Sequence, residues 1–152
     1  MKQEILMRGQ TASGGTEVLE FSGIQIENKN MAYKLIDFLL FPSTATGTTN
    51  YEMCGSITAG KTAMAPADQN FNDEGLIGSV VHDYENTSRG GPTNFFVIND
   101  TFLITQNLIL MVQDTGGSNH PVNWQCRFEA VKMTDAEMAA NNFKQYMISD
   151  GS

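Results

Sequence analysis

The sequence contains only two cysteines among its 152 residues, Cys54 and Cys126. Two cysteines are too few for the disulfide framework of a small secreted domain, and too few for a zinc site made of cysteine alone. Both lie in apolar runs, and free cysteine is among the most buried residue types. We therefore expect two buried free thiols rather than a disulfide.

Basic residues are also scarce. The chain has nine Lys and Arg against 17 Asp and Glu, which gives a formal net charge of −8, and the basic residues form no arm or stripe. Because neutralisation of phosphates drives affinity for nucleic acids, we expect no direct binding of DNA or RNA. The charge suits the outside of an assembly, or a seam between proteins, better than a surface that faces a genome.

Long hydrophobic runs are missing as well. The longest candidate, residues 102–112, is interrupted by Thr105, Gln106 and Asn107, whereas a membrane-spanning helix needs about 18 or more apolar residues in a row. The first residues contain no apolar core of signal-peptide length. We expect neither a membrane span nor an export signal.

What the sequence does contain is enough apolar material for one core. Its length is typical of a single domain, and 41% of its residues are hydrophobic. Apolar and polar residues alternate at period two, which is typical of strands with one buried face. This pattern predicts strands at residues 4–9, 16–21, 32–41, 51–58, 76–82, 94–98, 101–105, 108–113 and 122–132. We expect an all-β, antiparallel β-sandwich over residues 1–133, with a jelly roll as the leading version.

Only residues 134–152 are predicted to form a helix, followed by a polar tail within the same domain. Thr134 and Glu137 match a capping box, with the threonine as N-cap and the glutamate three residues later. Met138, Phe143 and Met147 would then form the apolar stripe of this helix.

One stretch satisfies the phosphate-binding P-loop pattern G-x-x-x-x-G-K-[ST], through Gly55, Gly60, Lys61 and Thr62. That chemistry needs a strand, a tight glycine loop and a helix whose N-terminal amides face the phosphates. The residues after Thr62 run into Pro66 and a polar loop instead of a helix, and no crossover helices separate the later strands. We interpret the match as a decoy and expect no bound cofactor.

An oxygen-rich loop is the weak candidate for a metal site. Its residues are Asp68, Asn70, Asn72, Asp73 and Glu74. They alternate like the start of a calcium loop, but the sixth position holds an aspartate where glycine is required, and the twelfth holds a serine where glutamate is required. A weak calcium site remains an alternative interpretation, although a solvated loop explains these residues more simply.

The two histidines, His82 and His120, are the remaining candidates for chemistry. Ser79 precedes His82 by three residues and Asp83 follows it, but no nucleophile elbow accompanies them. A zinc site at His120 would need ligands that the sequence does not show. Strand-end and loop positions explain both histidines, so we predict no catalytic site, and we expect Trp124 in the core.

A resemblance rests on the two ends of the chain. Its residues are the opening 1–9, the segment 33–38 that runs into Phe41-Pro42-Ser43, and the strand 124–133 that runs into Thr-Asp-Ala-Glu-Met. In this order they resemble a loosely defined family of small proteins encoded by marine phages and viruses. The resemblance implies a structural role in a virion and brings no catalytic residue with it.

Together these features predict a viral structural protein, such as a small capsid, minor capsid or decoration subunit. Its partners would be other copies of itself and other virion proteins, and its location the virion, after assembly in the host cytoplasm. Two alternatives remain: a β-sandwich module that binds carbohydrate or a host receptor, and a nucleotide-binding protein built on the P-loop pattern.

Overall fold

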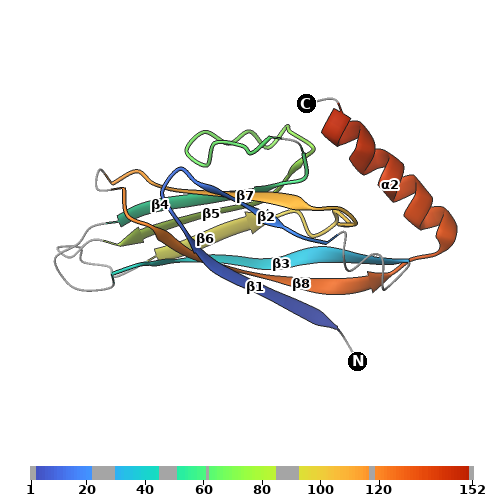
Figure 1. The fold of residues 1–152 in the computed structure, drawn as a ribbon, viewed down its shortest axis with the longest axis horizontal. Helices are drawn as coiled ribbons and strands as arrows, with labels where there is room; N and C mark the ends of the chain where they lie inside the picture. Colours follow the sequence, from blue (N-terminus) through green and yellow to red (C-terminus); the bar gives the residue numbers. More distant parts are fainter. Residues whose placement is uncertain are drawn as a thin grey trace.

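The computed structural model describes residues 3–21, 30–44, 51–60, 62–84, 93–116 and 119–150. Eight strands form two antiparallel sheets that pack face to face, and a helix follows at the C-terminus (Figure 1). The elements are β1 (Glu4–Thr11), β2 (Thr16–Leu19), β3 (Met31–Pro42), β4 (Tyr51–Thr58), β5 (Leu76–Tyr84), β6 (Thr93–Ile98), β7 (Leu108–Asp114), β8 (Val122–Lys132) and α2 (Asp135–Asp150). The predicted fold class, an all-β sandwich with one short C-terminal helix, is confirmed.

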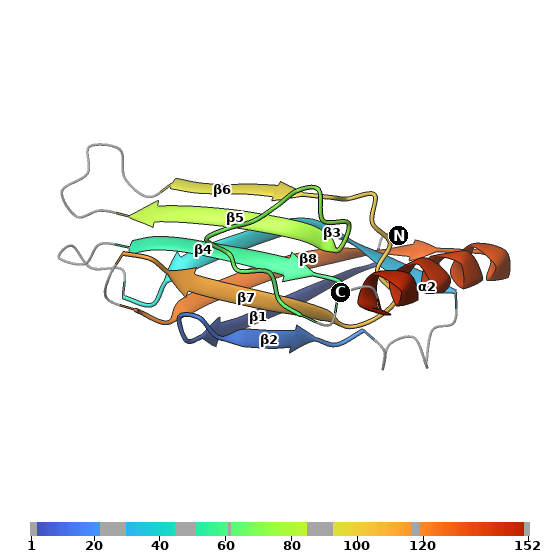
Figure 2. The ribbon, with the colours of Figure 1, turned by 90° about the horizontal axis from the view of Figure 1, so that it is seen from above.

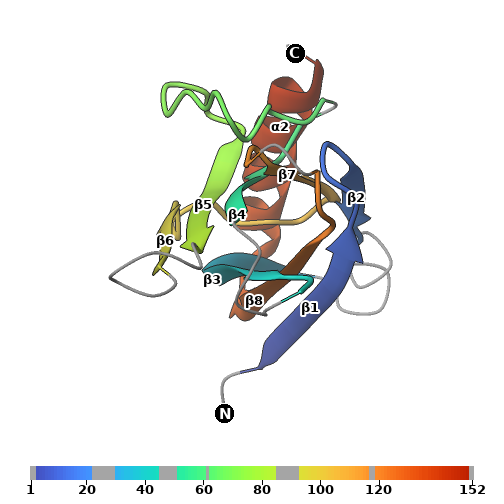
Figure 3. The ribbon, with the colours of Figure 1, turned by 90° about the vertical axis from the view of Figure 1, so that its left-hand side faces the viewer.

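The strand order is that of a jelly roll. One sheet has the order β1-β8-β3 and the other β2-β7-β4-β5-β6. Thus the first strand pairs with the last, the second with the seventh and the fourth with the fifth, as in a long hairpin wound into two layers. Strand β6 pairs with β5 and comes close to β3 in the other layer (Figure 3), where the side-chain amide of Asn94 donates a hydrogen bond to the carbonyl oxygen of Leu40.

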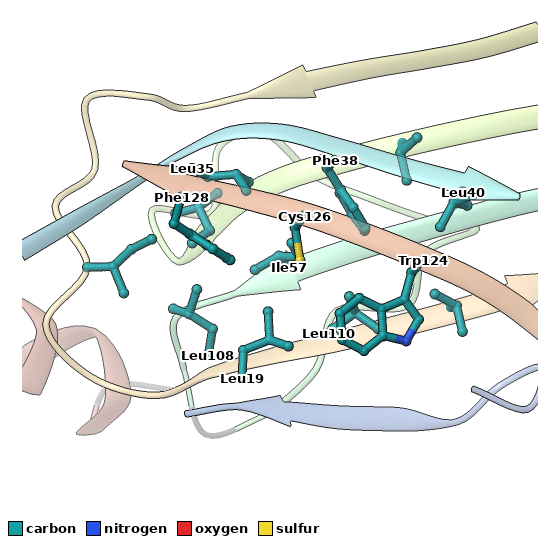
Figure 4. Packing of buried hydrophobic residues seen from close by; sticks show 14 of the residues in the cluster. Leu19, Leu35, Phe38, Leu40, Ile57, Leu108, Leu110, Trp124, Cys126 and Phe128 are labelled. Atoms are coloured by element: carbon teal, nitrogen blue, oxygen red, sulfur yellow. The ribbon is translucent and has the colours of Figure 1, made fainter. Parts of the chain in front are cut away.

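The core lies between the two sheets and follows from the alternation in the sequence. Every second residue of β7 and of the first seven residues of β8 is buried. Their inward side chains meet those of β3 and β4, as the close view of Leu110, Phe128, Phe38 and Ile57 shows (Figure 4). Trp124 belongs to this core, as predicted, and its indole N–H donates a hydrogen bond to the hydroxyl of Thr11 at 2.9 Å.

Two glycines let the sheets approach closely. A Cβ at residue 78 would lie 2.7 Å from Cδ2 of Leu35, and one at residue 55 would lie 3.0 Å from the ring of Phe38. Real Cβ atoms do not come as close as 2.7 Å to a neighbouring carbon, so Gly78 makes room for the leucine. Both glycines therefore have packing roles inside the sandwich.

Helix α2 closes one end of the sandwich (Figure 1). Its capping box is confirmed, because the amide of Glu137 donates to the hydroxyl of Thr134 at 3.2 Å and the glutamate carboxylate accepts that hydroxyl at 2.9 Å. Met138 packs in a small cluster with Ala32 and Met133. The predicted stripe is wrong at Phe143, which is 66% exposed. The side chain of Met147 lies outside the described residues.

The strand predicted at residues 101–105 is also wrong. Only Ile104 takes part in a ladder, as an isolated bridge to Tyr33. The segment joins β6 to β7 of the same sheet and touches the start of β3 at that bridge. The side chain of Asn99 caps its first turn by accepting hydrogen bonds from Thr101. Phe102 and Ile104 are buried because they close the end of the core. Their burial gives the sequence the alternating pattern of a strand, although the segment forms only one isolated bridge.

Candidate functional site

The P-loop pattern does not form a loop in the structure. Gly55 lies in the middle of β4 with partners on both sides, Val80 in β5 and Val112 in β7. Gly60 follows the end of that strand, and Lys61 lies outside the described residues. The described residues 62–75 form turns and bends without a helix. Gly55 is thus separated from the other described residues of the pattern by the rest of a strand.

The oxygen-rich loop uses two of its side chains to build its own turns. The side-chain oxygen of Asn70 accepts the amide of Asn72 at 3.0 Å, and a carboxylate oxygen of Asp73 accepts the amide of Gly75 at 2.8 Å. Asp68 and Glu74 are exposed on the same loop. Among the described residues, no group of three or more His, Cys, Asp or Glu side chains could hold a metal ion.

The longer loop that contains these residues, described over residues 62–75, lies over the outer face of β4 and β5 (Figure 2). The hydroxyl of Ser56 donates to the carbonyl of Met64 at 2.6 Å. The amide of Gln69 donates to the carbonyl oxygens of Gly55 and Pro66, and its oxygen accepts the hydroxyl of Ser79. The sequence predicts a loop here, but it does not reveal that the loop covers a sheet.

Beside the loop, the same face of the sheet is apolar and is not covered by any other described segment. An open groove of about 300 Å³ lies between the loop and strands β5 and β6. Its apolar lining includes Pro66, Phe71, Val81, Phe95 and Val97. Of these, Phe71 and Phe95 are 65% and 62% exposed. Isolated exposed apolar side chains are ordinary, but a contiguous group of them is a candidate interaction surface.

Strand β6 also has an open edge, and it forms one border of the molecule (Figure 2). The amide of Asn99 donates to the carbonyl of Ile77 at 2.9 Å. Because hydrogen-bonded and non-bonded pairs alternate along an antiparallel ladder, Phe95 and Val97 then point their backbone groups at β5. Asn94, Phe96 and Ile98 point theirs outward. No backbone group of the described residues bonds to these outward groups.

The two histidines occupy different environments. Nδ1 of His120 lies 2.8 Å from a carboxylate oxygen of Asp114, whose side chain is fully buried. The same carboxylate accepts hydrogen bonds from the backbone amides of Glu52, Gly116 and His120. Burial alone would raise the pKa of Asp114, but these hydrogen bonds hold it below its usual value. The group joins the β7–β8 turn to the start of β4, which is a structural role.

His82 is buried on the inner face of β5, and neither ring nitrogen has a hydrogen-bond partner among the described residues. Burial lowers the pKa of His82, and the nearby Asp83 opposes this shift only in part. The neutral form is therefore the one that fits the core. Sequence reasoning placed His82 near a strand end but gave no sign of an unpartnered ring.

Both cysteines are buried free thiols, as predicted. Burial raises the pKa of Cys54 to about 11, with a contribution from Asp114, and that of Cys126 to about 12, with a contribution from Asp37. The thiolate is the reactive form of cysteine, so neither residue is an activated nucleophile. No described helix is long and apolar enough to cross a membrane.

Comparisons with known proteins assign this chain to no family. No model of a known protein family matches the sequence, and no curated protein matches it. Among solved structures, the chain is similar to a chain in the three-dimensional structure of Cocksfoot mottle virus. The TM-score is 0.37 at 7% sequence identity, over 90% of this chain and 87% of the viral one. At this TM-score the likeness adds nothing to the strand topology described above.

Proposed function

We propose that this chain is a non-enzymatic structural subunit of a virus particle, which acts by packing against copies of itself and against other virion proteins. The proposal is carried by one observation, an exposed apolar surface on the outer face of the sheet. It is formed by Phe95 and Val97 of β6, Val81 of the neighbouring strand β5, and Phe71 of the loop. A surface of this kind on a folded domain is a site of protein–protein contact.

The edge itself supports an assembly role. Proteins that stay monomeric protect their edge strands with charges, proline, bulges or a covering segment. Strand β6 has the sequence TNFFVI, without a charge or a proline, and its pairing with β5 shows no bulge. An edge left in this state invites a further strand.

The topology and the charge are compatible with the same role. Jelly rolls occur in viral capsids as well as in lectins and cupins, so the fold alone is an analogy and does not choose among them. The net charge of −8 favours a position on the outside of a particle or between proteins. The resemblance to marine phage and virus proteins, and a location in the virion, stay predictions.

Native mass spectrometry and electron microscopy of the purified chain, over a rising concentration series, test this proposal. The expected result is a defined oligomer or a shell-like particle whose symmetry gives the copy number. A chain that stays monomeric at the highest concentration, alone and with the other proteins of its particle, would remove the assembly role.

Carbohydrate recognition is the second candidate, because Phe71 and Phe95 present aromatic side chains at the rim of an open groove. Aromatic rings are the usual apolar platforms of binding sites. Glycan binding measured with and without Ca²⁺ separates the two functions. Saturable binding that disappears in Phe95→Ala would favour recognition over assembly, and dependence on calcium would point to the loop at Asp73.

A further inference from the structure

We infer that two copies of this chain join edge to edge through β6, in an antiparallel pairing centred on Phe96 that makes one continuous ten-stranded sheet. The inference deepens the proposed assembly role and rests on it. It commits to a second copy of the chain as the occupant of the β6 edge and to one register of the pairing.

The outward backbone groups define what can bind. Asn94, Phe96 and Ile98 each direct an N–H and a C=O away from β5, as the alternation of the ladder requires. A row of alternating donors and acceptors is satisfied by another strand, since unpaired backbone groups remain costly to bury in any other contact. The occupant is therefore an extended segment.

The arrangement of these groups is self-complementary. With a two-fold axis at Phe96, the Phe96 residues of the two copies bond to each other, and Asn94 of each copy bonds to Ile98 of the other. This register pairs all three outward residues within the six residues of β6. If the register shifts so that Phe96 pairs with Asn94 of the other copy, Ile98 has no partner within β6. If Phe96 pairs with Ile98 instead, Asn94 has none.

The side chains agree with the same register. The two-fold axis is perpendicular to the sheet, so the outer faces of both copies stay on one side, and Phe95 of one copy lies opposite Val97 of the other. An aromatic residue opposite a β-branched residue is a favourable cross-strand pair. The exposed Val81 of each copy continues the apolar surface across the seam.

Charge also selects this edge for contact between copies. Each copy carries a net charge of −8, so two copies repel each other at most approaches. Strand β6 contains no charged residue. Pairing through it therefore brings no charged side chain of the paired strands themselves into the seam. One six-residue pairing buries less than the roughly 1,200–2,000 Å² of a standard stable interface, so we expect a weak dimer that symmetry reinforces in a larger assembly.

Cysteine cross-linking tests the register. The native thiols are buried, so wild-type protein under mild oxidation is the control. A mixture of Phe95→Cys and Val97→Cys proteins should form a disulfide dimer, because opposite non-bonded positions bring their Cα atoms within disulfide range. Each variant alone should stay uncross-linked. Cross-linking of either variant by itself, or none in the mixture, would overturn the pairing.

A second pair of variants tests the backbone. Phe96→Pro removes the outward N–H without removing a bond to β5, whereas Phe96→Ala keeps that N–H. In sedimentation experiments, Phe96→Pro should weaken dimerisation roughly tenfold or more relative to Phe96→Ala, at similar melting temperatures. Equal dimerisation of the two variants would contradict the pairing.

The same variants separate the pairing from the assembly role on which it rests. If Phe96→Pro still builds the same particles as the wild-type chain, the β6 pairing is wrong and the assembly role stands. If the mixed cysteine variants form cross-linked dimers but the wild-type chain never builds particles, the pairing stands and the assembly role is wrong.

Discussion

The outer face of the five-stranded sheet has two halves that differ in how they are covered. On β4, the small side chains of Cys54 and Ser56 are buried, and Gln69 and Ser56 bond the loop of residues 62–75 to the sheet. Over β6, Phe95 and Val97 remain exposed. One sheet thus places small and polar residues where its own chain covers it, and large apolar residues where nothing of the described chain does.

The comparison teaches that exposure on β6 does not come from a shortage of covering material. The loop passes next to the groove and contributes Pro66 and Phe71 to its wall. It seals the half that carries hydroxyl groups, with specific hydrogen bonds, and leaves the apolar half open. Because the loop leaves the apolar half of the face exposed, this half is available to bind another molecule.

Substitution of matched phenylalanines should give the largest contrast. Phe38 is fully buried between the sheets and Phe95 is mostly exposed. Phe38→Ala should lower the free energy of unfolding by about 3–5 kcal/mol, whereas Phe95→Ala should change it by less than about 0.5 kcal/mol in the monomer. Urea denaturation at low protein concentration measures both. A similar cost at the two positions would mean that β6 is part of the core.

Two glycines sharpen the packing side of the comparison. Gly78→Ala places a Cβ against Leu35 and should cost about 1–3 kcal/mol, because a well-packed core resists added volume. Gly60→Ala is the control, since its Cβ would find no atom closer than 3.9 Å. Thermal denaturation compares them, and a neutral Gly78→Ala would show that the sheets have more room than the structure indicates.

Acid should destabilise the β5–β6 side of the sandwich through His82. Its folded-state pKa lies below the ordinary 6.5 because of burial, so the unfolded chain binds the proton more readily. Stability from the neutral ring is therefore fully present above pH 6.5 and decreases as the pH falls toward the folded pKa, by at most about 1.4 kcal/mol per pH unit.

Urea denaturation of wild type and His82→Leu at about pH 7.5 and about pH 5, on either side of the ordinary histidine pKa, measures this dependence. Asp114 does not interfere, because its pKa is lowered from 3.8 and its contribution is lost only at more acidic pH. The leucine variant should lose less stability than wild type between the two pH values. Equal losses would mean that the ring finds a partner when it is protonated.

The sequence predicts the layers better than it predicts the edges. The alternation at residues 122–132 corresponds to β8 with its buried inward face, and the pair Thr134 and Glu137 marks the start of α2. These are local signals. Which strand borders a sheet depends on pairing between distant segments, so the pattern of β6 could not reveal its open edge. Phe102 and Ile104 alternate like a strand because burial, not pairing, sets the pattern.

The candidate surface could not be found from the sequence for the same reason. Phe71 and Phe95 are far apart along the chain, and only the path of the loop over β4 and β5 brings both to one groove. The P-loop pattern was the opposite case, a local match whose first glycine, Gly55, serves core packing. Composition could indicate an assembly role but not the surface that performs it.

The smallest expected effect concerns the loop that covers β4. Gln69→Ala removes hydrogen bonds to Gly55, Pro66 and Ser79. The loop should then open more often, and a thiol reagent should label Cys54 several-fold faster. Cys126 is the internal control, because it is buried between the sheets away from the loop. Unchanged labelling of Cys54 would show that the loop does not protect this half of the sheet.

The most direct measurement of the central claim is sedimentation velocity of the whole chain over a wide concentration range, beside Val97→Lys. This substitution places a charge on the exposed outer face of β6 without touching the core. The wild-type chain should associate as its concentration rises, and the lysine variant should remain monomeric at the same concentrations. Association that survives Val97→Lys unchanged, or a wild-type chain that never associates, would contradict the claim that β6 is where copies of this protein meet.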